Sequence, residues 1–317
     1  MTSIRRREYA KLSLGLAAFL LGLMAVYGLE QAWPTVGWWV FVVLTLSLGM
    51  GHGALDAVLL LAQFAPKSKA LRISAGYFLL VLLTGWLLSW SLGWALLALI
   101  AMSLWHFGEL QSDPVSRIAV GGASVMAPMF VANNQLTALI EPVLQGDRFA
   151  AWLVWYWLAI SWCVLVVAWL AFWLFQWAGQ QQASSGLHVN WRHPQMRALL
   201  EIVCVMGLYA IFSPLLAFAL YFGLYHCTVH IARVKRAVIN HYGLSKRQLA
   251  WAWFSSMLLT GLLMAALWKW LPSTGQSADL LDAQILHWLI VALGAVTVPH
   301  LLLVSYSRRW LQQPALM

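Results

Sequence analysis

Two histidines four residues apart, His226 and His230, are the residues in this sequence whose spacing most directly suggests chemistry. Four residues advance an α-helix by slightly more than one turn, so both imidazoles lie on one helix face. That spacing lets two ring nitrogens reach one metal ion. Apolar residues precede the pair, which places it within a membrane and indicates a functional site. The alternative is two neutral histidines that hydrogen bond to neighbouring helices.

Three further histidines lie in apolar segments of the chain. His52 occurs in the run Gly49-Met-Gly-His-Gly-Ala-Leu-Asp56, His106 in Trp105-His-Phe-Gly-Glu109, and His300 follows Pro299. A set of imidazoles without paired cysteines favours iron, zinc or copper and disfavours magnesium or calcium. Four imidazoles on one ferrous ion would leave a position open for O2.

Two carboxylates accompany these histidines. Asp56 follows His52 by four residues and Glu109 follows His106 by three, so each can share a helical face with its histidine. A buried carboxylate is costly unless it is paired. We interpret both as acceptors that fix imidazole tautomers. A direct ligand role stays open, and Glu109 could instead meet water or a cytoplasmic arginine.

Composition places these residues in a membrane protein. Of the 317 residues, 62% are hydrophobic and only 9% are charged, against about a quarter in soluble domains. The expected fold is all-α: a polytopic transmembrane helical bundle forming one integral membrane domain over residues 1–317. About ten spans are predicted, at residues 12–29, 37–63, 71–90, 92–110, 118–132, 151–177, 197–212, 214–233, 249–271 and 283–306. The first span could be peripheral to the rest, and the fifth could be re-entrant.

The distribution of basic residues supports this map. With both termini in the cytoplasm of a multi-pass inner (plasma) membrane protein, all but two of the 19 Lys and Arg residues lie on the inner side. The exceptions are Arg148 and Lys269. The same map puts His52, His106, the His226–His230 pair and His300 on even-numbered spans, which all run in one direction. All five then fall at a similar depth, and we expect them to converge.

Taken together, these motifs resemble the Brp/Blh family of membrane β-carotene 15,15'-dioxygenases. The resemblance covers spans two to ten with the motifs in order. It implies that His52, His106, His226 and His230 bind Fe(II), with His300, Asp56 and Glu109 as neighbours. It also implies cleavage of β-carotene by O2 to two molecules of all-trans retinal in the lipid bilayer, and a functional link to a microbial rhodopsin. No nucleic-acid partner is expected.

Aromatic residues beside these histidines are the expected wall of a substrate tunnel, although each could serve packing alone. They are Trp105, Phe107, Tyr221, Phe222 and Tyr225. An alternative function is a membrane electron carrier or transporter, in which the histidines would bind haem and the carboxylates would relay protons. A di-iron hydroxylase is disfavoured, because only His226 and His230 form the clustered histidine box that such sites use in number. The sequence has no phosphate-binding glycine loop, dinucleotide fingerprint or serine triad pattern.

Overall fold

The computed structural model describes residues 21–33, 35–63, 67–111, 113–144, 148–182, 193–243, 245–251, 253–255, 257–258 and 278–311. Every regular element in these ranges is a helix, which confirms the predicted all-α class. The elements are α2 (Thr35–Leu44), η1 (Thr45–Gly49), α3 (Met50–Gln63), α4 (Lys67–Trp90), α5 (Leu92–His106), α6 (Pro114–Val131), α7 (Asn133–Leu144), α8 (Arg148–Gln182), α9 (Pro194–Ile211), α10 (Pro214–Ala219), η3 (Leu220–Cys227), α11 (Thr228–Tyr242) and α13 (Ala278–Leu311).

Seven helices among the described residues are long and apolar enough to cross a membrane. They are Thr35–Leu60, Ser68–Trp90, Pro114–Val131, Trp152–Ala178, Pro194–Ile211, Pro214–Asn240 and Ile285–Ser307. The predicted fourth span is shorter, since its helix ends at His106 and the chain then turns. Half of the predicted first span and most of the ninth lie outside the described residues, so the count of ten is not confirmed. The predicted fifth span is a continuous helix, α6, despite Pro128.

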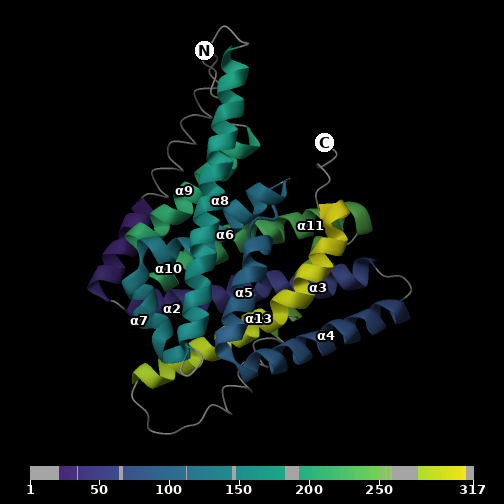
Figure 1. The fold of residues 1–317 in the computed structure, drawn as a ribbon. Helices are drawn as coiled ribbons and strands as arrows, with labels where there is room; N and C mark the ends of the chain where they lie inside the picture. Colours follow the sequence, from purple (N-terminus) through teal and green to yellow (C-terminus); the bar gives the residue numbers. More distant parts are fainter. Residues whose placement is uncertain are drawn as a thin grey trace.

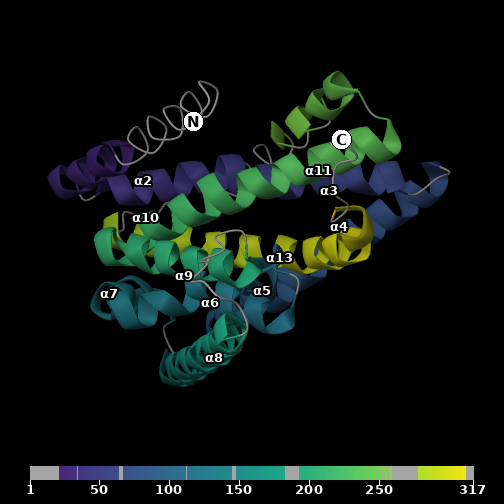
Figure 2. The same ribbon diagram turned by 90° about the horizontal axis from the view of Figure 1, so that it is seen from above.

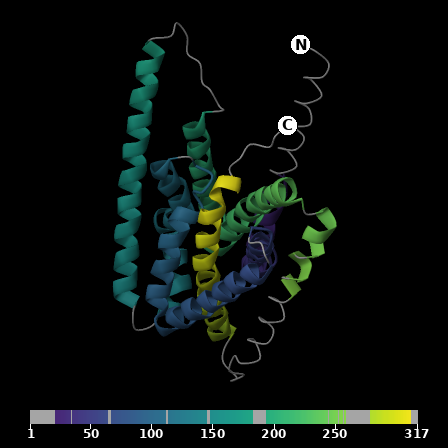
Figure 3. The ribbon, with the colours of Figure 1, turned by 90° about the vertical axis from the view of Figure 1, so that its right-hand side faces the viewer.

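Helix α13 runs through the middle of the bundle and packs against α4, α5, α7, α3 and α11. Figure 1 shows it in yellow crossing beside α4 and α5. Seen from above, α2 with α3, α10 with α11, and α13 form neighbouring rows (Figure 2). Figure 3 shows α8 standing along one side of the bundle. This arrangement lets three separate chain segments, which contain α3, α5 and α11, meet beside α13.

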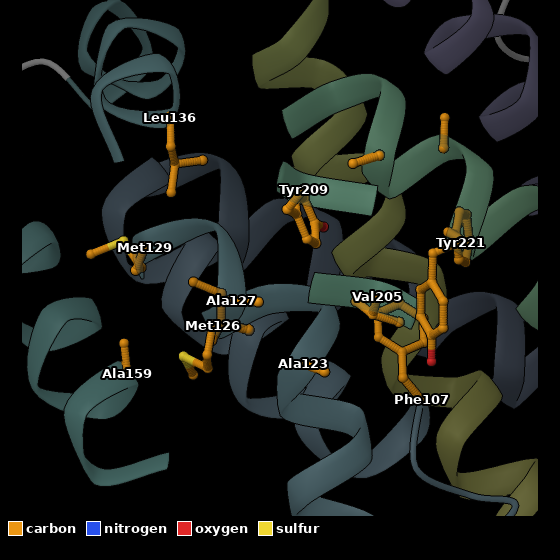
Figure 4. Packing of buried hydrophobic residues seen from close by; sticks show 14 of the residues in the cluster. Phe107, Ala123, Met126, Ala127, Met129, Leu136, Ala159, Val205, Tyr209 and Tyr221 are labelled. Atoms are coloured by element: carbon orange, nitrogen blue, oxygen red, sulfur yellow. The ribbon is translucent and has the colours of Figure 1, made fainter. Parts of the chain in front are cut away.

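Helix α6 packs tightly between its neighbours because small residues line its surface. Ala119 and Ala123 are fully buried, and Figure 4 shows Ala123, Ala127 and Met126 among side chains of α8 and α9. A Cβ atom added to Gly121 would lie 2.0 Å from the backbone oxygen of Leu104 on α5. The close contact of α5 and α6 therefore depends on glycine.

Tryptophans at a seven-residue spacing join α8 to α6. The indole Nε1–H groups of Trp155 and Trp162 donate to the Val125 and Ala119 carbonyl oxygens, at 3.1 and 2.9 Å. Trp169 donates to the Ser116 hydroxyl at 3.1 Å. A seven-residue repeat places side chains on one helix face, so this face of α8 is dedicated to α6. Three of the 21 tryptophans in the chain thus serve helix packing.

Candidate metal centre

Five buried imidazoles converge in the interior of the bundle. They are His52 from α3, His106 from the end of α5, His226 from η3, His230 from α11 and His300 from α13, each with at most 8% of its surface exposed. The His52 ring centroid lies within 6.0 Å of the other four centroids. The predicted convergence is therefore present, and it includes His300 as well as the four expected ligands.

The geometry at the centre of this cluster suits one metal ion. The Nε2 atoms of His106 and His226 are 3.0 Å apart. Two nitrogens at right angles around one ion, each about 2.1 Å from it, would lie about 3.0 Å apart. Ring nitrogens of His52, His106 and His226 all lie within 4.8 Å of one another. These three residues thus offer adjacent positions around a single ion.

Three of the five rings are held through their Nδ1 atoms. His52 Nδ1 donates to the Gly49 carbonyl oxygen, His230 Nδ1 lies 3.0 Å from Glu109 Oε1, and His300 Nδ1 lies 2.8 Å from Asp56 Oδ2. A carbonyl or a carboxylate can only accept, so Nδ1 carries the proton in each ring and Nε2 keeps its lone pair. That is the tautomer in which Nε2 binds metal.

Buried nitrogens without a hydrogen bond lie on the same rings. Nε2 of His230 and Nε2 of His300 are both buried, and neither has a hydrogen-bond partner among the described residues. An unpaired polar atom in the interior is costly. A metal ion within reach of these nitrogens would satisfy them, so the residue types present fit a metal; the ring nitrogens that lie within 4.8 Å of one another are those of His52, His106 and His226. His230 and His300 share this property, so it favours neither of them over the other as a ligand.

The two carboxylates do accept from imidazoles, but not from the histidines that precede them on the chain. Asp56 accepts from His300 of α13 and also from the Tyr77 hydroxyl, at 2.6 Å. Glu109 accepts from His230 of α11, while His106 Nδ1 lies 3.7 Å from Glu109 Oε2. Glu109 does not accept from His106 because α5 ends at His106, which leaves Glu109 in a turn and not on the helical face of His106.

The Glu109 carboxylate faces a cation as well as an imidazole. The Arg233 guanidinium also lies 3.6 Å from the Glu109 carboxylate. The turn after α5 therefore carries a negative charge that orients His230 from outside the cluster.

Two π-helical segments, η1 and η3, pack against each other at the site. η1 ends at Gly49, whose carbonyl anchors His52, and η3 contains His226. A Cβ atom added to Gly49 would lie 2.6 Å from the Phe222 ring. This glycine therefore permits the close approach of η1 and η3. π-Helical turns shift the direction of the following side chains and are frequent at functional sites.

A cavity of about 580 Å³ borders the imidazoles. His52, His106 and His300 form part of its wall, and most of the other lining side chains are apolar. Phe107 and Phe222 also line it, as the tunnel prediction has them. An apolar cavity with a few convergent polar groups is the usual form of a small-molecule site.

The other three predicted tunnel aromatics lie elsewhere. Tyr221 is buried and its hydroxyl donates to Glu201 at 3.3 Å, so it faces α9. Tyr225 is 42% exposed, and Trp105 is 38% exposed with the Arg117 guanidinium over its ring. Phe222 and His226 share one helical face, whereas Tyr221 and Tyr225 share the next one. Of these four residues, only Phe222 lines the cavity.

The sequence reasoning missed one contributor to the cavity, helix α7. This stretch was assigned to an outer loop, yet Leu136, Leu139 and Ile140 line the cavity. Their spacing of three and one residues is the apolar pattern of an amphipathic helix. The pattern is present in the sequence, directly after the polar Asn133-Asn134 pair at the start of the helix.

Comparison with known proteins agrees with this site. The family model for beta-carotene 15,15'-dioxygenase matches residues 42–307, which include all five histidines. A beta-carotene 15,15'-dioxygenase from the uncultured marine bacterium 66A03 is 23% identical over 287 residues, covering 86% of this chain and 94% of that protein. No solved structure matches. Because the family model covers most of the chain, the chain belongs to the beta-carotene 15,15'-dioxygenase family.

Proposed function

We propose that this chain cleaves the central 15,15' double bond of β-carotene with O2 and releases two molecules of all-trans retinal. The observation that carries the proposal is the group of buried imidazoles on the wall of a large apolar cavity. Family membership and the name of the bacterial relative support the same substrate and reaction class. An apolar substrate dissolved in the bilayer could reach such a cavity without crossing water.

The reaction balances without an acid, a base or an external reductant. One carbon–carbon double bond breaks, and each of its carbons takes one oxygen atom of O2 to form an aldehyde. The described carboxylates at the site are consistent with this chemistry, since Asp56 and Glu109 hold imidazoles and do not face each other. The cleavage reaction therefore needs no proton relay.

We assign Fe(II) to His52, His106, His226 and His230; when bound, it supplies the activation of O2. The protein itself orients the imidazole rings and excludes water from the cavity. Gly49 and Glu109 fix two of the rings through Nδ1. The apolar wall, including Phe107 and Phe222, keeps water from the polyene and confines its position beside the imidazoles.

The haem-carrier alternative is less well supported. Two axial imidazoles on one haem lie on opposite sides of the iron, about 4 Å apart if each nitrogen is about 2 Å from the metal. The His106 and His226 nitrogens are 3.0 Å apart instead. The further rings of His52, His230 and His300 around this pair would also obstruct a porphyrin plane.

Expression in a carotene-accumulating bacterium tests the function. Cells that carry the chain should lose their colour and accumulate retinal, and cells that carry a His230→Ala variant should keep their carotene. Unchanged carotene with folded, iron-loaded wild-type protein would refute the proposed function. Coexpression with a microbial rhodopsin would test the predicted link, through regeneration of the pigment.

A matched pair of variants tests the ligand assignment. We expect His230→Ala to lose iron and activity, and His300→Ala to keep about one iron per chain while activity falls. Purified protein is assayed for iron by metal analysis and for fold by thermal unfolding. Loss of iron in His300→Ala with retention in His230→Ala would reverse the assignment of these two residues.

A further inference from the structure

The candidate metal centre lies partway along the cavity and not at its end. On the α2–η1–α3 segment the cavity is lined from Phe41 to Leu60, and His52 lies between them. Eleven residues separate Phe41 from His52, and eight separate His52 from Leu60. At about 1.5 Å per residue these stretches correspond to about 16 and about 12 Å. The cavity therefore has two arms that meet at the imidazoles.

The inner arm runs toward α7 and ends among buried side chains. Its end is formed by Leu136, Ile140, Trp155 and Leu286, each at most 6% exposed. Along α13 the lining extends from His300 back to Leu286, about 21 Å at the helical rise. Two polar groups of the wall are already paired, because the Trp155 indole donates to Val125 and the Tyr209 hydroxyl to Ser124. Among the described residues, this arm is closed and mostly apolar; its polar exception is the buried Thr45 hydroxyl, which has no hydrogen-bond partner among those residues.

The outer arm runs toward α4 and reaches the surface of the bundle. Ala57, Ser74, Tyr77, Phe78 and Val81 line it. Phe78 is 53% exposed, and none of the membrane-spanning window of α4 is buried inside the protein. An exposed apolar helix of that length faces hydrocarbon in a bilayer. The mouth of this arm therefore opens sideways to lipid.

We propose that the substrate enters end-first from the bilayer through the outer arm, passes the imidazoles and seats its leading half in the inner arm. The depth of the closed arm then sets which double bond lies beside the metal. This inference rests on the proposed function. β-Carotene is about as long as the hydrocarbon is thick, about 30 Å, so half of it is about 15 Å. The inner arm measures about 16 Å along α2–η1 and about 21 Å along α13, so it is long enough to hold this half while the central bond lies beside the imidazoles.

Filling the closed end tests the measuring role of the inner arm. Leu139 and Leu215 line that end and are only half-buried, so tryptophan there should shorten the arm while the bundle still folds. We expect Leu139→Trp and Leu215→Trp to shift the cut off centre, giving two unequal apocarotenals and a retinal share reduced on the order of tenfold. The matched control is Ala138→Trp, an exposed neighbour outside the lining.

Narrowing the mouth tests the route. Val81→Trp in the outer arm should raise KM and slow carotene uptake from vesicles, with the product still retinal. Leu82→Trp, on the lipid face and outside the lining, is its control. Retinal as the sole product of both inner-arm variants at unchanged KM would overturn the measuring role. Equal KM in Val81→Trp and Leu82→Trp would overturn the route.

Binding of carotene separates this proposal from the proposed function. Metal-free protein in vesicles is titrated with β-carotene, and binding is followed by the visible absorption band. The inner-arm variants should bind at least several-fold more weakly than wild type and Ala138→Trp. If wild type binds carotene but never cleaves it, the proposed function fails. The binding measurement still tests whether the substrate occupies the two arms. Equal binding by all variants would refute the seating of substrate in the inner arm.

Discussion

At the scale of single residues, the site is organised by what holds each imidazole from behind. Three groups each accept a hydrogen bond from a protonated imidazole Nδ1. They are the backbone oxygen of Gly49 and the carboxylates of Glu109 and Asp56. The Nε2 atoms of His230 and His300 are then left buried and, within the part of the chain that the structure describes, without hydrogen-bond partners. A polar atom left this way in an apolar interior indicates a ligand that satisfies it. The anchors therefore define the site as much as the ligands do.

Removing the charge of one anchor should weaken the site without unfolding the protein. In Glu109→Gln the amide can still accept from His230, but it no longer carries a negative charge and leaves Arg233 unpaired. Loss of such an outer partner typically costs about 10- to 100-fold in metal affinity. Iron affinity measured by competition with a chelator should fall by about that factor.

The matched control is Glu201→Gln. Glu201 is also a membrane-level carboxylate, but it accepts from Tyr221 on the far side of η3 and not from an imidazole. The Glu201→Gln variant should bind iron with the wild-type affinity. Equal affinities of Glu109→Gln and wild type would show that Glu109 does not support a metal ligand.

At the scale of elements, backbone contact between α5 and α6 fixes the position of His106 and Glu109. Both residues lie at or just after the end of α5, where the chain turns back. The Gly108 Cα lies so near α6 that an added Cβ would be 1.9 Å from the Arg117 backbone oxygen. Backbone cannot move aside as a flexible side chain can. The turn is thus locked to α6 by the absence of a side chain.

A methyl group at this position should separate the two helices. We expect Gly108→Ala to lower the melting temperature in detergent. The free energy of unfolding should fall by about 1–3 kcal/mol or more, because overpacking forces backbone shifts. Iron content should fall as well, since His106 and Glu109 move together. Both quantities are read by thermal unfolding and metal analysis of the purified variant.

Gly76→Ala on α4 distinguishes a local clash from a general effect of glycine replacement. Nothing lies within 4 Å of a Cβ atom added there. Alanine is the better helix former by about 1 kcal/mol, so this variant should be as stable as wild type or slightly more stable. A wild-type melting temperature for Gly108→Ala would contradict the proposed lock.

How far the sequence could predict this molecule depends on the kind of contact. Histidines on apolar segments that run the same way can be placed at one depth by counting, which is why the convergence of His52, His106 and His226 was predictable. Which carboxylate meets which histidine was not, because Asp56 reaches His300 across a helix–helix contact. Helix lengths, the π-helical turns and the packing of α7 over the cavity depend on tertiary contacts that local patterns do not specify.

At the scale of the whole molecule, the bundle is defined by a centre and a periphery. α6, with 67% of its spanning window buried, belongs to the centre, whereas α4 has none of its window buried. α8 is 35 residues long, about 53 Å at the helical rise, and so exceeds a hydrocarbon core of about 30 Å. A helix of that length, standing along the membrane normal, extends beyond the hydrocarbon on at least one side.

The orientation of this bundle follows from its charges. Translocation of basic residues is disfavoured, so loops rich in Lys and Arg stay in the cytoplasm. Both termini, with Arg5 to Arg7 at one end and Arg308 and Arg309 at the other, should lie inside, as should the segment after α8. Reporter fusions after Gly146 and after Gln276 should therefore report the outer side, and a fusion after Gln182 the cytoplasm. An inside report from Gly146 would reverse α8 and every later span, and with it the shared direction that brings His226, His230 and His300 to the depth of His106.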